Sequence, residues 1–285
     1  MPNWVRVTVI AKDADVLKEK LLNDKDNVDF NKLIPMPEEL NISSGSNSYE
    51  VQSSGYYSDY KAEQIKSQKP ADEIMAGYYN DTITQRQFVD KCLANEELCS
   101  IVREIKRWTD EYASNKPINN WTKEVEESPY ETFFRGYFNV HRFGHNDWYD
   151  WCIENWGTKW NAKETFVVDD HTVDFETAWS MPEPVFVELA KYTDIRVIYA
   201  DENLGFNCGV VDYKYNKETG EVDIDEIITE SRALAYIVWG FDNLEVYDED
   251  YNEITDENDE RVIAATKEYA EMFERFEQLR DVSTL

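Results

Sequence analysis

The chain has 285 residues, of which 59 are Asp or Glu and 29 are Lys or Arg, so its formal net charge is −30. Because like charges repel, this excess excludes DNA, RNA and anionic membranes as direct ligands and favours a partner with a positively charged surface. Hydrophobic residues make up 42% and aromatic residues 14% of the chain, which excludes a protein that is disordered throughout.

The first 40 residues predict a strand, a helix and a second, short strand. Trp4–Ile10 alternates apolar and polar residues, which is typical of a strand with one buried face. Asp13 is placed to cap a helix predicted for residues 14–23. Phe30–Ile34 precedes a Pro-Met-Pro sequence and predicts a short strand that ends in a rigid turn.

Residues 41–147 carry a different pattern. Ser, Gly, Asn and Tyr dominate residues 41–60, a loop composition whose tyrosines either pack back onto the protein, the interpretation we favour, or bind a ligand. From Thr84 to about Ala113, apolar residues recur with a period near 3.6 residues, which predicts helix. We therefore expect a mainly helical insertion here.

The region after residue 171 predicts the rest of a sheet. Thr172–Trp179 has the pattern of a strand, and Ser180 with Glu183 has the spacing of a capping box for a helix that ends near Lys191. Three further strands, joined by turn-like sequences, form an antiparallel meander. They span residues 195–200, 206–213 and 221–228.

The C-terminal segment, residues 229–285, is distinguished by its charge. A helix from Thr229 to Trp239 is predicted to end at Gly240, and an apolar stripe from Val262 to Leu279 predicts a terminal helix. From residue 201 onward, 24 acidic and 7 basic residues give a net charge of −17, more than half of the total. Ten acidic residues and no basic residue lie within residues 242–260: Asp242, Glu245, Asp248, Glu249, Asp250, Glu253, Asp256, Glu257, Asp259 and Glu260.

Four sequence blocks resemble a known family. They are MPNWV at residues 1–5, FNKLIPMPEEL at 30–40, WCIENWGTKW at 151–160 and FETAWSMPEPV at 175–185. Together they resemble the phage and prophage family with a YubB-type ferredoxin-like domain. The resemblance implies a split βαββαβ sheet with a helical insertion, carried by a mobile element in a bacterial host, and it implies no activity, because a fold does not determine a function.

We therefore expect an α+β fold, with a split ferredoxin-like antiparallel sheet, a helical insertion and a C-terminal helix. The expected segments are residues 1–40 with 148–228 for the ferredoxin-like domain, 41–147 for the insertion and 229–285 for the acidic C-terminal segment.

Three tryptophans of the resembling blocks predict an aromatic cluster. Trp156 and Trp160 are four residues apart across Gly157, and Trp179 ends a predicted strand. The cluster is either part of the core, the interpretation we favour, or a groove for a ligand.

The sequence offers no catalytic constellation that we would defend. It contains none of the motifs GxxxxGK[ST], GxGxxG and GxSxG. Its four cysteines form no CxxC pair, which suits a reducing cytoplasm and predicts buried, inert thiols. They are Cys92, Cys99, Cys152 and Cys208.

The histidines form no strong metal motif. His141 and His145 have the i, i+4 spacing of metal ligands without the HExxH pattern, and His171 follows two aspartates. In a chain with 59 acidic residues such neighbours arise by chance, so we expect no catalytic residue, no metal site and no cofactor. No apolar run reaches the roughly 18 residues that span a bilayer, and the first residues do not resemble a signal peptide, so we expect a cytoplasmic protein.

These observations lead to one hypothesis for the function. The protein is a non-enzymatic phage protein of the bacterial cytoplasm that binds and inhibits a basic, nucleic-acid-handling host defence protein through the ten acidic residues of 242–260. A chain of this length has a diameter of roughly 50 Å, and B-DNA of that length carries roughly 30 charges, so acids on one face would imitate DNA. The alternatives are a small-molecule- or metal-dependent enzyme, or a structural phage protein kept soluble by its charge; self-association into a homo-oligomer also stays open.

Overall fold

The computed structural model describes residues 3–42, 87, 91, 94, 139, 142–145 and 147–285. The chain forms two units, Met1–Pro35 with Cys152–Leu285 and Met36–Trp151. Several expectations lie outside the described residues. These are the loop tyrosines of 41–60, the helices of 84–113, Cys92, Cys99 and His141.

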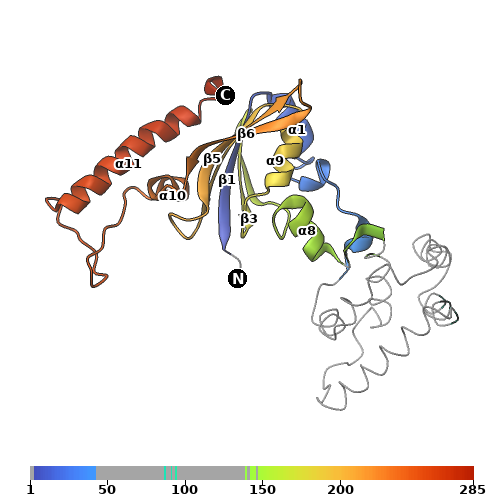
Figure 1. The fold of residues 1–285 in the computed structure, drawn as a ribbon, viewed down its shortest axis with the longest axis horizontal. Helices are drawn as coiled ribbons and strands as arrows, with labels where there is room; N and C mark the ends of the chain where they lie inside the picture. Colours follow the sequence, from blue (N-terminus) through green and yellow to red (C-terminus); the bar gives the residue numbers. More distant parts are fainter. Residues whose placement is uncertain are drawn as a thin grey trace, which may run out of the picture. The chain divides into compact units, whose positions relative to one another are not determined.

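The first unit is built on a six-stranded antiparallel sheet with the order β2-β3-β1-β4-β5-β6 (Figure 1). The central strand β1 pairs with β3 on one side and with β4 on the other. The strands are β1 (Trp4–Ala11), β2 (Lys163–Asp169), β3 (Thr172–Ala178), β4 (Ile195–Asp201), β5 (Cys208–Asn216) and β6 (Glu221–Thr229).

Two helices complete the ferredoxin-like order of elements. Helix α1 (Ala14–Leu21) follows β1, and α9 (Glu183–Ala190) connects β3 to β4, so β1-α1-β2-β3-α9-β4 is a βαββαβ unit. Strands β5 and β6 extend the sheet beyond β4 as the expected meander. The expected α+β class is confirmed.

Helices cover both faces of the sheet. Helices α1 and α9 lie on one face, and α10 (Arg232–Trp239) and α11 (Glu260–Leu279) lie on the other (Figure 1). Phe175 of β3 contacts Phe186 of α9, whereas Ile10 of β1 packs in a cluster with Leu234 of α10 and Phe276 of α11. The prediction of one buried face for β1 is therefore wrong, because alternate residues of this strand pack beneath different helices.

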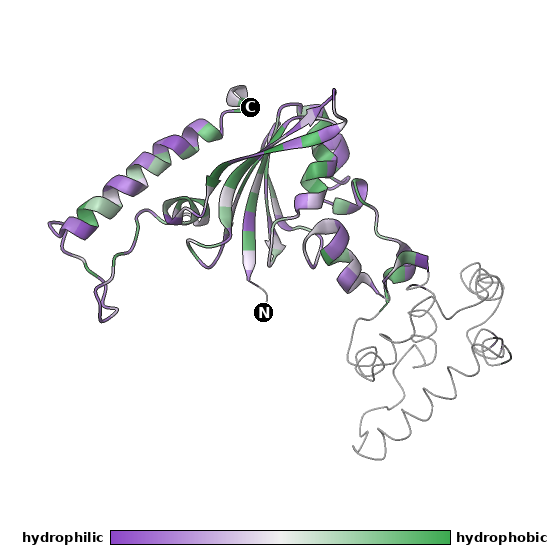
Figure 2. Ribbon diagram, in the orientation of Figure 1, coloured by the Kyte–Doolittle hydropathy of each residue, from purple (hydrophilic) through white to green (hydrophobic). Residues whose placement is uncertain are grey.

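Hydropathy follows this layered arrangement. Figure 2 shows hydrophobic residues concentrated in the central strands, α9 and α10, whereas hydrophilic and hydrophobic residues alternate along α11. Phe276 is the buried residue of α11, so most of this helix faces solvent. No helix among the described residues is both long and apolar enough to cross a membrane.

Local sequence signals set several element ends as expected. The Asp13 carboxylate accepts the N–H groups of Asp15 (3.0 Å) and Val16 (3.2 Å) and caps α1. Gly240 has φ +80° and ends α10 in the left-handed conformation that glycine adopts at low cost. Both predictions are confirmed.

The segment Phe30–Ile34 is not the predicted strand. It begins with a 3-10 helix, η1 (Phe30–Lys32), because the Asp29 carboxylate accepts the N–H of Asn31 (3.0 Å) and the N–H of Leu33 bonds back to the carbonyl of Phe30 (3.1 Å). The tight turn buries Phe30 against the ring of Trp156.

The predicted capping box at Ser180 is also wrong. Helix α9 begins at Glu183 after Pro182, which makes no side-chain capping bond. The Ser180 hydroxyl instead donates to the carbonyl of Gly157. Prolines at 182 and 184 fix the backbone of the first turn, so the helix starts later than the Ser–Glu spacing indicates.

Three further elements lie at or near the ends of the described ranges. In the second unit, η2 (Glu38–Leu40) follows Pro37, and the Asn139 side-chain amide donates to the carbonyl of Glu39 (2.8 Å). Helix α8 (Trp148–Trp156) is shared between the ranges of the two units. After α11, the chain ends in η4 (Val282–Thr284).

Candidate functional site

The ten acidic residues predicted to bind a partner lie between α10 and the first turn of α11, in the first unit. They divide into two groups by exposure. The half-buried group is Glu245, Asp248 and Asp259. The exposed group is Asp242, Glu249, Asp250, Glu253, Asp256, Glu257 and Glu260.

The half-buried acids hold the segment together. The Asp248 carboxylate accepts the N–H groups of Asp250 and Asn252, both at 2.9 Å, and these bonds, chiefly those from Asn252, lower its pKa. Glu245 Oε2 accepts the hydroxyl of Tyr247 at 2.7 Å. These two carboxylates are therefore structural, and they are less available to a partner than the sequence indicated.

Asp259 has a similar structural role at the start of α11. Its carboxylate accepts the N–H of Arg261 (2.9 Å) as the N-cap and also receives the Arg261 guanidinium (3.0 and 2.8 Å). The guanidinium hydrogen bonds, followed by the backbone bond, lower the pKa of Asp259 to about 2. The carboxylate thus keeps its charge well below neutral pH.

The middle of the segment folds back on itself as a small hairpin. Tyr247 and Glu253 form an antiparallel bridge, and the N–H of Ile254 donates to the carbonyl of Val246 at 2.7 Å. Tyr251 at the tip is 89% exposed and has φ +61°. The exposed acids around this hairpin are therefore presented by an ordered backbone.

The beginning of the segment is fixed to the two C-terminal helices. Leu244 is buried with Ala233 and Tyr236 of α10. The Tyr269 hydroxyl of α11 donates to the carbonyl of Phe241 at 2.7 Å. The Arg232 side chain of α10 also donates to the carbonyl of Glu245. The acidic segment is thus attached to the same helices that cover the sheet.

Strand β6 carries additional acids that the sequence analysis missed as site candidates. Glu221, Asp223 and Asp225 occupy alternate positions of this edge strand and are exposed. Alternate residues of a strand point to the same side, so these three carboxylates share one face. The signal was present in the sequence as acids at every second position of a predicted strand.

The histidines form no metal site in the part of the chain that the structure describes. There, no group of three His, Cys, Asp or Glu side chains is arranged to hold an ion. His171 Nδ1 lies 2.9 Å from the carbonyl of Ala11 and must donate to it. Burial raises the pKa of Asp147, and burial also raises the pKa of the Cys208 thiol, which keeps this thiol in its unreactive form.

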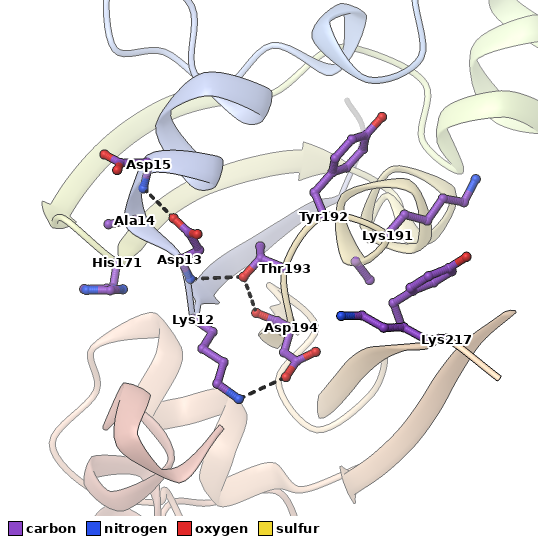
Figure 3. A pocket seen from close by; sticks show the side chains of 12 residues that line it. Lys12, Asp13, Ala14, Asp15, His171, Lys191, Tyr192, Thr193, Asp194 and Lys217 are labelled. Carbon is purple, nitrogen blue, oxygen red and sulfur yellow. Dashed lines mark hydrogen bonds and ion pairs between the residues drawn. The ribbon is translucent and has the colours of Figure 1, made fainter. Parts of the chain in front are cut away.

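A groove of about 550 Å³ opens where β1 meets α1 and where α9 meets β4 (Figure 3). Lys12 Nζ pairs with Asp194 at 3.1 Å, and the N–H of Asp13 donates to the Thr193 hydroxyl at 3.0 Å. The lining residues are Lys12, Asp13, Ala14, Asp15, His171, Ala190, Lys191, Tyr192, Thr193, Asp194, Tyr215 and Lys217. Its three lysines and three aspartates balance in charge. The lining contains no Ser or Cys that could act as a nucleophile.

The three tryptophans do not form one cluster. Trp156 is buried, packs edge-on against Phe30 at 5.7 Å and donates its indole N–H to the carbonyl of Ile34 at 2.9 Å. Trp160 lies against Trp4 at 6.1 Å, and Trp179 is 51% exposed. The expectation of a core residue is confirmed for Trp156 and is wrong for Trp179.

Part of the first unit is similar to a known protein family. Residues 155–242 match the family model described as a ferredoxin-like domain in Api92-like protein. The match begins in α8, contains β2 to β6 and ends at Asp242, so most of the acidic segment lies beyond it. No curated protein and no solved structure matches the chain. The matched region and the strand order together identify a ferredoxin-like domain within this chain.

Proposed function

We propose that the protein is a non-enzymatic, phage-encoded inhibitor that acts in the bacterial cytoplasm and binds a basic, nucleic-acid-handling host defence protein. The observation that carries this proposal is the ordered display of exposed carboxylates between Asp242 and Glu260 in a chain of net charge −30. The similarity of residues 155–242 to a ferredoxin-like domain supports the ferredoxin-like part of the fold that the sequence blocks imply.

Order in the acidic segment favours binding over simple solvation. Asp248 and Asp259 fix the backbone of the hairpin and the start of α11, so less conformational entropy is lost when a partner binds the exposed carboxylates. Arginine and lysine side chains of a nucleic-acid-binding surface form charge-assisted hydrogen bonds with carboxylates as they do with phosphates. Association is then fast and weakens as salt increases.

The test is a charge-removal variant that leaves the structural acids in place. Asp242, Glu249, Asp250, Glu253 and Glu257 are replaced by the corresponding amides, and Asp248, Asp256 and Asp259 are kept because their carboxylates accept backbone N–H groups. Purified bacterial defence nucleases are then assayed for binding to the protein and for displacement of the protein by duplex DNA, at low and at high salt. We expect the variant to lose affinity and much of its salt dependence.

A matched control removes five exposed acids elsewhere in the first unit: Asp15, Asp24, Asp26, Glu164 and Asp170. This variant has the same net charge as the test variant, so it reports the effect of charge alone. Equal loss of affinity in both variants, or loss in neither, would contradict a site in residues 242–260.

The groove is the feature that favours the second candidate function, binding of a small molecule. Tyr192 and Tyr215 are exposed in it, and Lys217 carries a charge that no acid of the described residues pairs. A small anion with an apolar part fits this chemistry. Saturable shifts of the groove residues in an NMR titration with nucleoside monophosphates would support this candidate, and unchanged spectra would remove it.

A further inference from the structure

Trp179 has a backbone conformation that is unusual for its side chain. Its φ is +73°, in the left-handed region that bulky residues rarely adopt. The backbone is held on both sides, because its N–H donates to the carbonyl of Asn3 (2.9 Å) and its carbonyl accepts the side-chain amide of Asn207 (3.1 Å). Yet the indole is 51% exposed, so the strain is not compensated by burial of the ring.

A network around a buried carboxylate supports this conformation. Asp201, at the end of β4, accepts the N–H of Asn203 at 2.8 Å and the amide of Asn207 at 3.2 Å. Asn207 itself has φ +47°. The side chain of Asn207 therefore links the turn between β4 and β5 to the residue that presents the indole.

The same turn presents a second aromatic ring. Phe206, next to Asn207, is 72% exposed, and Glu202 of this turn is exposed as well. Leu204 packs against two clusters, one with Ala235 of α10 and one that contains Leu244 at the start of the acidic segment. The turn that carries Phe206 is thus packed against the base of the acidic segment.

We propose that Trp179 and Phe206 are the aromatic part of the partner-binding surface and that they contact arginine side chains of the basic partner. This inference rests on the proposed function, because it assumes a basic partner. A guanidinium group stacks on aromatic rings and is weakly hydrated, whereas a lysine ammonium is strongly hydrated and lacks a planar face. Within the chain, Arg6 already stacks on Trp239, with 4.2 Å between its guanidinium carbon and the ring centre.

Charge complementarity supports this occupant over a second copy of the chain. A copy also carries −30, so its acidic surface is repelled by Glu202 and by the exposed acids beyond Leu244. Two exposed aromatic rings on linked segments, with the exposed Glu202 in the same turn as Phe206, match the chemistry of arginine, whose side chain combines an apolar stem with a charged guanidinium group.

The test compares nona-arginine with nona-lysine as probes of the full chain. The test variant combines Trp179→Gly, which also removes the backbone strain, with Phe206→Ser. The control is Phe166→Ser, which removes an exposed ring from the edge strand β2, where Phe166 lies opposite Asp174 rather than at the end of β3 that leads to Trp179. Titration calorimetry should show about a three- to tenfold loss of nona-arginine affinity in the test variant, less than about twofold for nona-lysine, and no change in the control.

A fold control accompanies these measurements. Trp179→Asn keeps a residue that tolerates the left-handed conformation, and its thermal midpoint and circular dichroism should match those of the unchanged protein. Loss of nona-arginine affinity in this variant alone would support the proposal.

The outcomes separate this inference from the proposed function. If the five-amide variant loses affinity for both peptides while the Trp179→Gly/Phe206→Ser variant binds as the unchanged protein does, the aromatic contact is overturned and the acidic surface stands. Equal loss for arginine and lysine probes in the aromatic variant overturns the arginine preference. Unchanged binding in both variants overturns both proposals.

Discussion

Arg196 of β4 and Asp212 of β5 form a buried ion pair, with N···O distances of 2.6 and 2.8 Å. The two residues face each other directly in the strand register, and each side chain is 5% exposed. Arg196 Nη1 also donates to the carbonyl of Leu279 (3.0 Å) and to the Thr284 hydroxyl (2.8 Å). The pair therefore fixes the end of α11 and η4 to the sheet.

Asp212→Asn should destabilise the protein strongly. The substitution leaves the Arg196 guanidinium buried with reduced compensation, which costs about 3–5 kcal/mol in comparable sites. Urea denaturation measures the free energy of unfolding. The control is Glu176→Gln, which breaks the directly opposed but more exposed pair with Arg6 and should cost less than about 1 kcal/mol. A similar loss of unfolding free energy for both substitutions would contradict the idea that burial makes the Arg196–Asp212 pair the more important one.

Tyr213→Phe should stabilise the protein. Among the described residues, the Tyr213 hydroxyl is the buried side-chain polar group without a hydrogen-bond partner, and an unsatisfied buried group costs about 1–3 kcal/mol. Tyr269→Phe is the control, because its hydroxyl donates to the carbonyl of Phe241 and its loss should destabilise by about 0.5–1.5 kcal/mol. A destabilising Tyr213→Phe would show that the hydroxyl has a partner.

The same tyrosine gives a dependence of stability on pH. Burial raises the pKa of Tyr213 above its ordinary value of 10.0. The folded state therefore binds the proton more tightly than the unfolded state, so this contribution to stability is present below pH 10.0 and is lost as the pH rises above it. The decline at high pH should be smaller in Tyr213→Phe, and an equal decline would argue against burial as its cause.

Asp259 should titrate near its lowered pKa of about 2 rather than 3.8. A carboxylate with a lowered pKa stabilises the folded state above its unfolded pKa, and this contribution is lost as the pH falls toward 2. Arg261→Ala should raise the pKa of Asp259, as measured by NMR of its carboxyl carbon. Lys267→Ala, which removes a cation paired with Glu271, should leave the Asp259 titration in place.

Gly157→Ala should cost more stability than Gly220→Ala. Both glycines have a positive φ, +78° and +76°, so both substitutions carry the same backbone strain of about 1–2 kcal/mol. A Cβ at residue 157 would lie 2.8 Å from Pro184 Cδ, whereas a Cβ at residue 220 meets nothing within 4 Å. The thermal midpoints of the two variants measure this difference. Equal midpoints would mean that Pro184 and the start of α9 shift to make room for the added Cβ at little cost.

The sequence predicted those parts of the fold whose signals are local. The Asp13 cap, the Gly240 stop and the meander from β4 to β6 follow from side-chain chemistry and alternation that are visible in a few residues. Strand β2 was missed because it lies at the sheet edge, where Phe166 is 65% exposed and the register shifts, so no alternation marks it. Burial of the second β1 face depends on α10 and α11, which come much later in the chain.

The candidate site was predictable in position and not in detail. Ten acids without a base are visible in the sequence, but the hydrogen bonds that make Asp248 and Asp259 structural depend on the backbone between them. The exposed Trp179 was predicted to be buried because tryptophans usually are, and its conformation depends on Asn207 and Asp201 from a later turn. Its site assignment therefore required the tertiary structure.

The two outer strands of the sheet also restrict how other chains can approach. On β6, acids at every second position would repel an added strand, and on β2 the register shifts and the φ of +47° at Glu164 interrupt the row of main-chain groups. Neither border provides a template for polymerisation through backbone pairing. Recognition of another protein by this sheet would therefore rely on side chains rather than on added strands.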